Sequence, residues 1–357
     1  MEKINRKLII IVSTDLPSGV WTYANNLALL MKPIFSEVMI LKPSSKFEIP
    51  QGQIPMDFRG INFLFNWVRL IINRHEFSNS IVHLNGRLTI ISFAPLILMY
   101  PRRFVYTFHQ YIGISDRKME KIKNKLELAL ALRVGLRIAV SKTLAHHLLR
   151  DYRIQSVPIA NWLNEESLNV NDYCEISNKE IDFLYIGRYA NEKNPSIVIE
   201  AANLILRRYS DVKFHLYGYG ELYEELCYAS KGNPNIAVNH VTHEATELMS
   251  KSRFFILPSL TESFGFSAVE AIASGCILLA SNIQQLDEVL DGFIVFRFAP
   301  DVLSLVGAIE DILQIDEEEL KKIIENNLFR VKERFGSGLA LEQYSKMYAA
   351  LVSERIE

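Results

Sequence analysis

The sequence predicts an α/β protein of two domains, each built on a parallel β-sheet with helices on both faces. Short β-branched or aromatic runs alternate with longer helical patterns over almost the whole chain, and such alternation is typical of parallel sheets. The length of 357 residues suits two hydrophobic cores better than one. A polar stretch without an apolar period, residues 161–179, interrupts the alternation and is interpreted as the linker.

The N-terminal half begins with charged residues and then a short apolar run, Leu8–Val12. A signal peptide needs a longer apolar region and a small-residue cleavage site, so this run is interpreted as a buried first strand. Alternation then continues through this half. We expect strands at Lys7–Ser13, Glu37–Leu41, Ser80–Leu84, Arg103–Phe108 and Leu136–Val140, and helices at Val20–Met31, Ile61–Arg74 and Lys118–Arg133.

The C-terminal half repeats the pattern and ends in a segment with one apolar face. We expect strands at Ile181–Ile186, Val212–Tyr217, Arg253–Leu257 and Cys276–Ala280, and helices at Pro195–Tyr209, Phe266–Ser274 and Leu339–Val352.

Composition excludes several classes of protein. With 49% apolar and 22% charged residues the chain is globular, and a net charge of −2 argues against a nucleic-acid partner. Three widely spaced cysteines match no zinc site and suit reduced thiols in the cytoplasm. The longest apolar stretches, such as Ile90–Met99, are too short to cross a bilayer.

Ligands of open parallel sheets bind beyond the carboxyl ends of the strands. Six loops follow predicted strands and hold many of the chain's Gly, Arg, His and Glu residues. A binding site is therefore expected among Thr14–Gly19, Asn85–Arg87, His109–Tyr111, Gly187–Asn194, Gly218–Glu221 and Pro258–Gly265.

The most informative of these segments is Glu262–Glu270. Gly265 permits close backbone approach to a ligand, and the helix that follows directs free N–H groups at the loop, which suits an anion. Glu270 falls one turn after Phe266, so two carboxylates bracket an anion site at the helix start. The alternative interpretation is a capping acid plus a surface glutamate.

The segment resembles the E-x7-E motif of the retaining glycosyltransferases of family 4, the group 1 glycosyl transferases, and the similarity extends over Phe255–Gly275. The resemblance implies that Glu262 contacts hydroxyls of the donor sugar and that Glu270 contacts the nucleotide ribose. It also assigns to donor binding the residues of the helix start, Ser263, Phe264, Gly265 and Phe266.

The run from Gly187 to Asn194 resembles the same family's G-R-x4-K-N loop. Arg188 and Lys193 after a strand end can converge on one diphosphate, Arg188 as a bidentate donor and Lys193 as a point charge. A diphosphate leaving group gains negative charge as the glycosidic bond breaks, so such cations stabilise the transition state. The alternative is a solvated loop with two ordinary surface charges.

Two further segments resemble the family, and a third, at Gly19, departs from it. His109 ends a strand and matches the histidine that faces donor and acceptor, although a histidine there can also be an ordinary core residue. Gly19 stands in the loop after the first strand, where the family commonly has two glycines. Gly218 and Gly220 match its G-x-G segment near the base and phosphate.

The resemblance implies the GT-B fold, in which two Rossmann-like domains face a central cleft and the last helix crosses back to the N-terminal domain. We therefore expect an N-terminal acceptor domain at 1–160 with helix 338–357, and a C-terminal nucleotide-sugar domain at 161–337. The chain lacks the Asp-x-Asp pair through which metal-dependent transferases hold diphosphate. A metal-independent site without a cofactor is expected.

The function that this resemblance implies is retaining, hexosyltransferase-type sugar transfer from a nucleotide-diphosphate sugar to a glycan acceptor. The acceptor would belong to bacterial surface polysaccharide (O-antigen, capsule or lipopolysaccharide) and could be lipid-linked. The basic run Arg117–Lys125 and the aromatic-rich Ile61–Arg74 suit contact with an anionic membrane, or else a solvated face and a core helix. The alternatives left open are a sugar-nucleotide epimerase and a non-catalytic nucleotide-sugar-binding partner.

Overall fold

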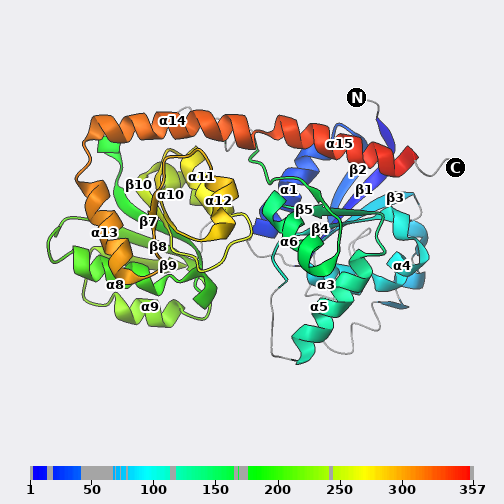
Figure 1. Cartoon of the computed structure of the whole chain (residues 1–357), viewed down its shortest axis with the longest axis horizontal. Coiled ribbons are helices and arrows are strands. Elements are labelled where there is room, and N and C mark those ends of the chain that lie inside the picture. Colours follow the sequence, from blue (N-terminus) through cyan, green and yellow to red (C-terminus); the bar gives the residue numbers. More distant parts are fainter. Residues whose placement is uncertain are drawn as a thin grey trace. The chain divides into compact units, whose positions relative to one another are not determined.

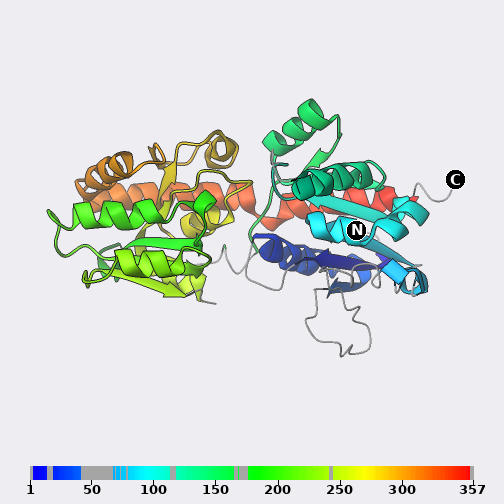
Figure 2. The same cartoon turned by 90° about the horizontal axis from the view of Figure 1, so that it is seen from below.

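The computed structural model describes residues 3–13, 19–41, 67–68, 70–72, 74–77, 79–112, 118–164, 168, 176–240 and 244–353. The chain forms two compact units. Met1–Trp162 with Ser337–Glu357 make unit 1, and Leu163–Gly336 make unit 2. Each unit has one six-stranded sheet with helices on both faces (Figures 1 and 2). All neighbouring strands pair in parallel, so the predicted class of two doubly wound α/β sheets is confirmed.

The sheet of unit 1 has the strand order β2-β1-β3-β4-β5-β6. Its central strands are buried on both faces because helices cover both. The order reverses between β1 and β3, and ligands of such sheets bind beyond the strand ends at this switch point. The strands are β1 (Ile4–Val12), β2 (Phe35–Leu41), β3 (Ser80–Asn85), β4 (Phe104–Phe108), β5 (Leu136–Ala139) and β6 (Val157–Pro158).

The helices of unit 1 include the last helix of the chain, α15 (Ser337–Ser353). Tyr344 and Tyr348 of α15 are fully buried against the unit. The Tyr348 hydroxyl lies 2.6 Å from His83 Nδ1 on β3, so a polar contact fixes α15 to the sheet. The other helices in the described part of this unit are α1 (Gly19–Met31), α3 (Arg87–Ser92), α4 (Ala94–Met99), α5 (Lys118–Ala131) and α6 (Lys142–Tyr152), with 3-10 turns η1 (Arg74–Phe77) and η2 (Pro101–Arg103).

The sheet of unit 2 has the strand order β12-β11-β10-β7-β8-β9, which is the dinucleotide-binding order of doubly wound folds. The chain moves outward from β7 to β9, then returns to the other side of β7 with β10. The switch point therefore lies between β7 and β10. The strands are β7 (Ile181–Arg188), β8 (Phe214–Tyr219), β9 (Ile236–His240), β10 (Ser252–Leu257), β11 (Ile277–Ser281) and β12 (Phe296–Phe298).

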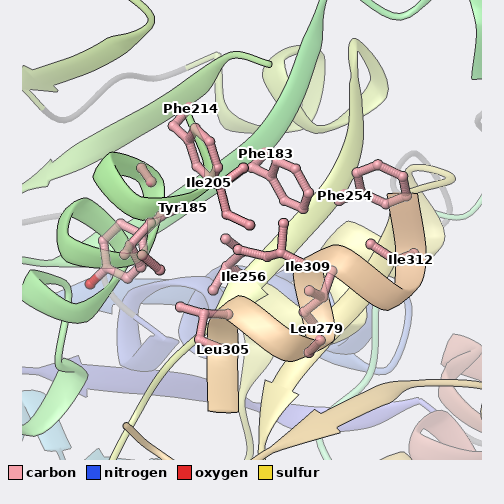
Figure 3. Packing of buried hydrophobic residues seen from close by; sticks show 14 of the residues in the cluster. Phe183, Tyr185, Ile205, Phe214, Phe254, Ile256, Leu279, Leu305, Ile309 and Ile312 are labelled. Carbon is pink, nitrogen blue, oxygen red and sulfur yellow. The ribbon is translucent and has the colours of Figure 1, made fainter. Parts of the chain in front are cut away.

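One face of this sheet packs an aromatic and aliphatic core (Figure 3). The Phe183 ring stacks on Phe214 with centroids 4.9 Å apart, while Leu305 and Ile309 cover the sheet from one helix. This core fixes the strand ends that carry the site. The helices described in this unit are α8 (Ser196–Ile205), α9 (Tyr223–Ala229), α10 (Ala245–Ser250), α11 (Phe266–Ala273), α12 (Asp287–Leu290), α13 (Val302–Leu313) and α14 (Glu317–Phe335), with turns η3 (Ile176–Asn178), η4 (Asn191–Lys193) and η5 (Gln284–Leu286).

Several boundaries differ from those expected. β7 runs on to Arg188 and β8 to Tyr219, so Gly187, Arg188 and Gly218 lie in strand ends rather than loops. Their pairing with each other extends the sheet beyond the apolar runs that marked it in the sequence. The described part of the chain does not include most of the helix expected at Ile61–Arg74, residues 14–18 or Arg117.

Candidate functional site

Arg188 is the last residue of β7, at the switch point of unit 2. Its backbone is fixed because the buried Tyr185 hydroxyl donates a hydrogen bond to its carbonyl oxygen at 2.7 Å. The Arg188 side chain is 51% exposed, and its guanidinium pairs with Glu192, one turn further on. Arg188 is thus a cation on a rigid backbone, with a solvent-accessible head group.

Lys193 ends the turn η4 that follows β7. Asn194 adopts a left-handed conformation, φ 54°, and its N–H closes the turn on the Ala190 carbonyl oxygen. The ammonium of Lys193 points to the loop after β10, where its Nζ lies 2.5 Å from Oε1 of Glu262. The two strand ends that border the switch point are therefore joined by an ion pair.

Glu262 lies in that second loop and its side chain is only 9% exposed. Ser259 Oγ donates a second hydrogen bond to the same oxygen, Oε1, at 2.8 Å. The Leu260 N–H donates to the Glu192 carbonyl oxygen at 2.9 Å, so the backbones of the two loops are also joined. A buried carboxylate needs such partners, and the two partners found among the described residues both contact Oε1.

The helix α11 begins directly after this loop with Gly265 at its N-cap. Gly265 has φ +80°, and a Cβ at this position would approach Leu286 Cδ2 to 3.0 Å, so glycine is required. No side chain caps the helix, so its first N–H groups can donate hydrogen bonds to an anion. Phe264 is buried against Phe335, while Ser263 and Phe266 are half-buried.

Glu270 occupies the middle of α11 and is half-buried. Burial raises the pKa of its carboxyl to about 7. None of the described residues donates a hydrogen bond to this carboxylate or forms an ion pair with it. Glu270 can therefore accept hydrogen bonds from a ligand without first giving up a protein partner.

Gly218 and Gly220 have a structural reason to be glycine. A Cβ on Gly218 would come within 2.1 Å of the Gly187 carbonyl oxygen. A Cβ on Gly220 would come within 2.3 Å of the Tyr189 carbonyl oxygen. Glycine at both positions lets the end of β8 pack closely against the end of β7. This packing fixes the position of the Arg188 backbone, which pairs with Tyr219 of β8.

In unit 1, Gly19 is the first residue of α1, and His109 follows β4. The Nε2 of His109 lies 2.9 Å from Oδ1 of Asn85, and its ring packs edge-on against Tyr23. Burial lowers the pKa of His109 to about 3, so the imidazole is neutral. His109 thus contacts the end of β3, one of the two strands that border the switch point of unit 1, and Gly19 begins the helix that follows the other one, β1.

The structure adds residues that the sequence did not single out. Glu192, Ser259 and Asn85 each contact a predicted site residue. All three lie in or beside loops predicted to carry the site, yet nothing in their local pattern indicates the contact partner. Among the described residues, no cluster of His, Cys, Asp and Glu could hold a metal ion. No helix in the same part of the chain is long and apolar enough to span a membrane.

Family models match both halves of the chain. The glycosyl transferases group 1 model matches residues 174–328, and the glycosyltransferase family 4 model matches residues 18–164.

Curated relatives are also glycosyltransferases. An uncharacterized one from Methanocaldococcus jannaschii is 28% identical over 60% of this chain and 59% of its own. The capsular polysaccharide biosynthesis glycosyltransferase CapH of Staphylococcus aureus is 21% identical over 66% and 67%. A UDP-Gal:α-D-GlcNAc-diphosphoundecaprenol α-1,3-galactosyltransferase of Escherichia coli is 26% identical over 41% and 39%. These matches span between two fifths and two thirds of each relative.

Solved structures share the fold over nearly the whole chain. Sucrose-phosphate synthase from Thermosynechococcus elongatus superposes with a TM-score of 0.79 at 17% identity, covering 98% of this chain and 100% of that one. HepE from Anabaena, in complex with UDP and glucose, superposes with a TM-score of 0.76 at 16% identity, covering 97% and 100%. At such identity these matches establish the fold.

Proposed function

The chain belongs to the group 1 glycosyltransferases of family 4 and has the GT-B fold, and from this premise we propose that it transfers a sugar from a nucleoside-diphosphate donor to a glycan acceptor with retention of the anomeric configuration. The observation that carries the proposal is the ion pair between Lys193 and Glu262 at the switch point of unit 2. There a cation, a carboxylate and an uncapped helix start are held together by two joined loops.

The two cations, Arg188 and Lys193, bind the diphosphate of the donor. Arg188 presents an exposed guanidinium that can bind phosphate oxygens bidentately, and Lys193 adds a point charge. Without a ligand, Arg188 pairs with Glu192 and Lys193 pairs with Glu262. A diphosphate that binds either displaces these carboxylates from the cations or binds beside them. As the glycosidic bond breaks, the diphosphate gains negative charge, and fixed cations stabilise that state more than the bound donor.

The two carboxylates, Glu262 and Glu270, accept hydrogen bonds from hydroxyl groups of the donor. Both described contacts of Glu262 use Oε1, which leaves Oε2 as an acceptor for hydroxyls of the donor sugar. Glu270 has no described partner and suits the ribose hydroxyls. The acceptor oxygen bonds to the anomeric carbon on the face from which the diphosphate departs, and the departing phosphate oxygen takes the acceptor proton. Transfer with retention then needs neither a side-chain base nor a side-chain nucleophile. We propose that it is also metal-independent, because Arg188 and Lys193 supply the charge that a divalent ion would.

A donor screen followed by product analysis tests this function. UDP-, GDP-, ADP- and dTDP-sugars are compared by thermal shift, since a bound donor stabilises the folded state by mass action. NMR of the product with the best donor is expected to show an α-linkage, and donor incubated alone is expected to keep its sugar unchanged. Epimerised free donor, or binding without transfer to any acceptor, would contradict the proposal.

The acceptor proposed is a lipid-linked glycan of a bacterial surface polysaccharide, reached at the inner face of the cell membrane. Support comes from the capsular relative and from the relative whose name specifies a diphosphoundecaprenol acceptor. On α5, Met119, Ile122 and Leu126 are exposed at helical spacing, and lysines flank them. An apolar stripe beside ammonium groups suits an anionic lipid surface.

Vesicle flotation tests the membrane contact. The protein should float with anionic vesicles and not with neutral ones, and Ile122→Glu with Leu126→Glu should abolish flotation. The matched control is Leu303→Glu, at an exposed apolar position of α13 in unit 2. Equal flotation on neutral and anionic vesicles would remove the electrostatic part of this proposal.

A further inference from the structure

Asn85 is the last residue of β3 and its side chain is fully buried at the switch point of unit 1. Its amide nitrogen Nδ2 donates to the carbonyl oxygens of Ile11, at 3.2 Å, and His83, at 3.3 Å. These two bonds use both amide hydrogens. The orientation of the amide is therefore fixed, and Oδ1 points away from both carbonyls as an acceptor.

The group that meets this acceptor is the His109 ring. Its Nε2 lies 2.9 Å from Asn85 Oδ1. Because Oδ1 can only accept, Nε2 must carry the proton. A neutral imidazole has one protonated nitrogen, so Nδ1 is left unprotonated and becomes an acceptor. No described residue donates a hydrogen bond to Nδ1.

We propose that Asn85 is a positioning residue that holds His109 in the Nε2–H tautomer, so that Nδ1 is presented as a hydrogen-bond acceptor to a hydroxyl group of the sugar being transferred or of the acceptor glycan. The proposal rests on the sugar-transfer function proposed above. It assigns to Asn85 a role that acts through His109 and requires no contact of Asn85 with substrate.

The surroundings of His109 keep the ring neutral. Among the described residues, the nearby titratable groups are Tyr23 on α1 and His83 on β3. Burial raises the pKa of the Tyr23 hydroxyl and lowers the pKa of His83 to about 3, so neither carries charge near neutral pH. No described carboxylate contacts His109. The tautomer of its ring is therefore determined by the hydrogen bond to Asn85 and not by a neighbouring charge.

Nitrogen NMR of 15N-histidine-labelled full-length protein tests the tautomer directly, with His109→Gln used to assign the signals. We expect Nε2 of His109 to be protonated and Nδ1 unprotonated throughout the neutral pH range. In Asn85→Leu the two tautomers should become mixed, and kcat/KM for sugar transfer should fall about tenfold, which is the effect of one lost polar interaction. An Nδ1–H tautomer in the wild type would overturn the proposal even if every variant misfolded.

Two further variants separate positioning from simple stability. Thr107→Val removes a buried hydroxyl that bonds His83 at 2.6 Å on the same sheet, and it should leave the His109 tautomer unchanged. Asn85→Asp retains an acceptor but adds charge, so the pKa of His109 should rise and transfer should become acid-sensitive, unlike the wild type.

An Asn85→Leu protein with an unchanged tautomer, or with unchanged kcat/KM, would contradict the inference. A wild type that transfers no sugar from any donor would refute the proposed function, while the NMR signals still decide the tautomer.

Discussion

Lys193 and Glu262 are 69 residues apart in the sequence, yet Lys193 Nζ lies 2.5 Å from Glu262 Oε1. The pair joins the loops after β7 and β10, the two strands that border the switch point of unit 2. A cation and a carboxylate that hold each other here are already oriented when a ligand arrives. The side chains thus lose little conformational freedom on binding.

Loss of the Lys193 ammonium should strongly reduce catalysis. In Lys193→Met, kcat is expected to fall by about 100-fold or more, because a fixed charge at the leaving group is removed. Steady-state kinetics with the preferred donor provide the measurement. Lys251→Met serves as the control, since Lys251 forms an ion pair of similar length with Glu247 at the exposed surface of unit 2, and its kcat should stay near the wild-type value. Wild-type kcat in Lys193→Met would remove the residue from the mechanism.

The Glu270 carboxyl should make stability depend on pH. Its pKa is raised from its ordinary 4.5 to about 7 in the folded state, so the folded protein binds a proton more tightly than the unfolded chain. The free energy of unfolding should therefore decrease as the pH rises through this interval. Denaturant titrations over this range should show the decrease in wild type. Glu270→Gln should abolish it, whereas Glu325→Gln at an exposed position of α14 should not.

The affinity for the donor should depend on pH through the same carboxyl group, Glu270, but in the opposite direction to stability. An ionised carboxylate accepts hydrogen bonds from ribose hydroxyls more strongly than a protonated one. We expect donor affinity to increase as the pH rises through about 7, and this increase to be absent in Glu270→Gln. Calorimetry in buffers of different ionisation enthalpy would detect the accompanying proton release. The same proton release in both proteins would exclude Glu270 from the donor site.

The contact of α15 with unit 1 should contribute measurably to stability. Tyr348→Phe leaves the buried Nδ1 of His83 without its partner at 2.6 Å, which should reduce the free energy of unfolding by about 1–3 kcal/mol. Chemical denaturation measures this difference. Tyr228→Phe, at a side chain 81% exposed, should have almost no effect. Equal stabilities of the two variants would show that the contact is not stabilising.

Close packing at the end of β8 predicts a contrast between two glycines. A methyl group on Gly218 would meet the Gly187 carbonyl oxygen at 2.1 Å, whereas one on Gly307 in α13 would meet nothing within 4 Å. Gly218→Ala should lower the unfolding free energy by about 1–3 kcal/mol. Gly307→Ala should raise it by about 0.5–1 kcal/mol, because alanine is the better helix former. Denaturant unfolding of both variants tests the contrast, and a tolerated Gly218→Ala would refute the packing argument.

The sequence predicts the sheets better than the helices. Buried parallel strands are short apolar runs, and nine of them could be located in this way. The long helix α14 was not predicted, because its buried residues are spread among many charges. Its N-cap was available as a signal, since Asp316 accepts a hydrogen bond from the Glu319 N–H. The same kind of signal, Ser141 capping Leu144, marks α6.

The sequence predicts which residues form the candidate site, but it does not predict which of them contact one another. The strand-end rule places Arg188 and Lys193 near Glu262, because the ends of β7 and β10 meet at one edge of the sheet. That Lys193 pairs with Glu262 while Arg188 pairs with Glu192 depends on how the turn η4 folds. The bond from His109 to Asn85 likewise depends on the register of β3 and β4.

A crystal structure with a nucleoside-diphosphate sugar tests the central claim most directly. We expect diphosphate oxygens within hydrogen-bond distance of Arg188 and Lys193, sugar hydroxyls on Glu262, and ribose hydroxyls on Glu270. A bound donor whose diphosphate contacted neither Arg188 nor Lys193 would contradict the account.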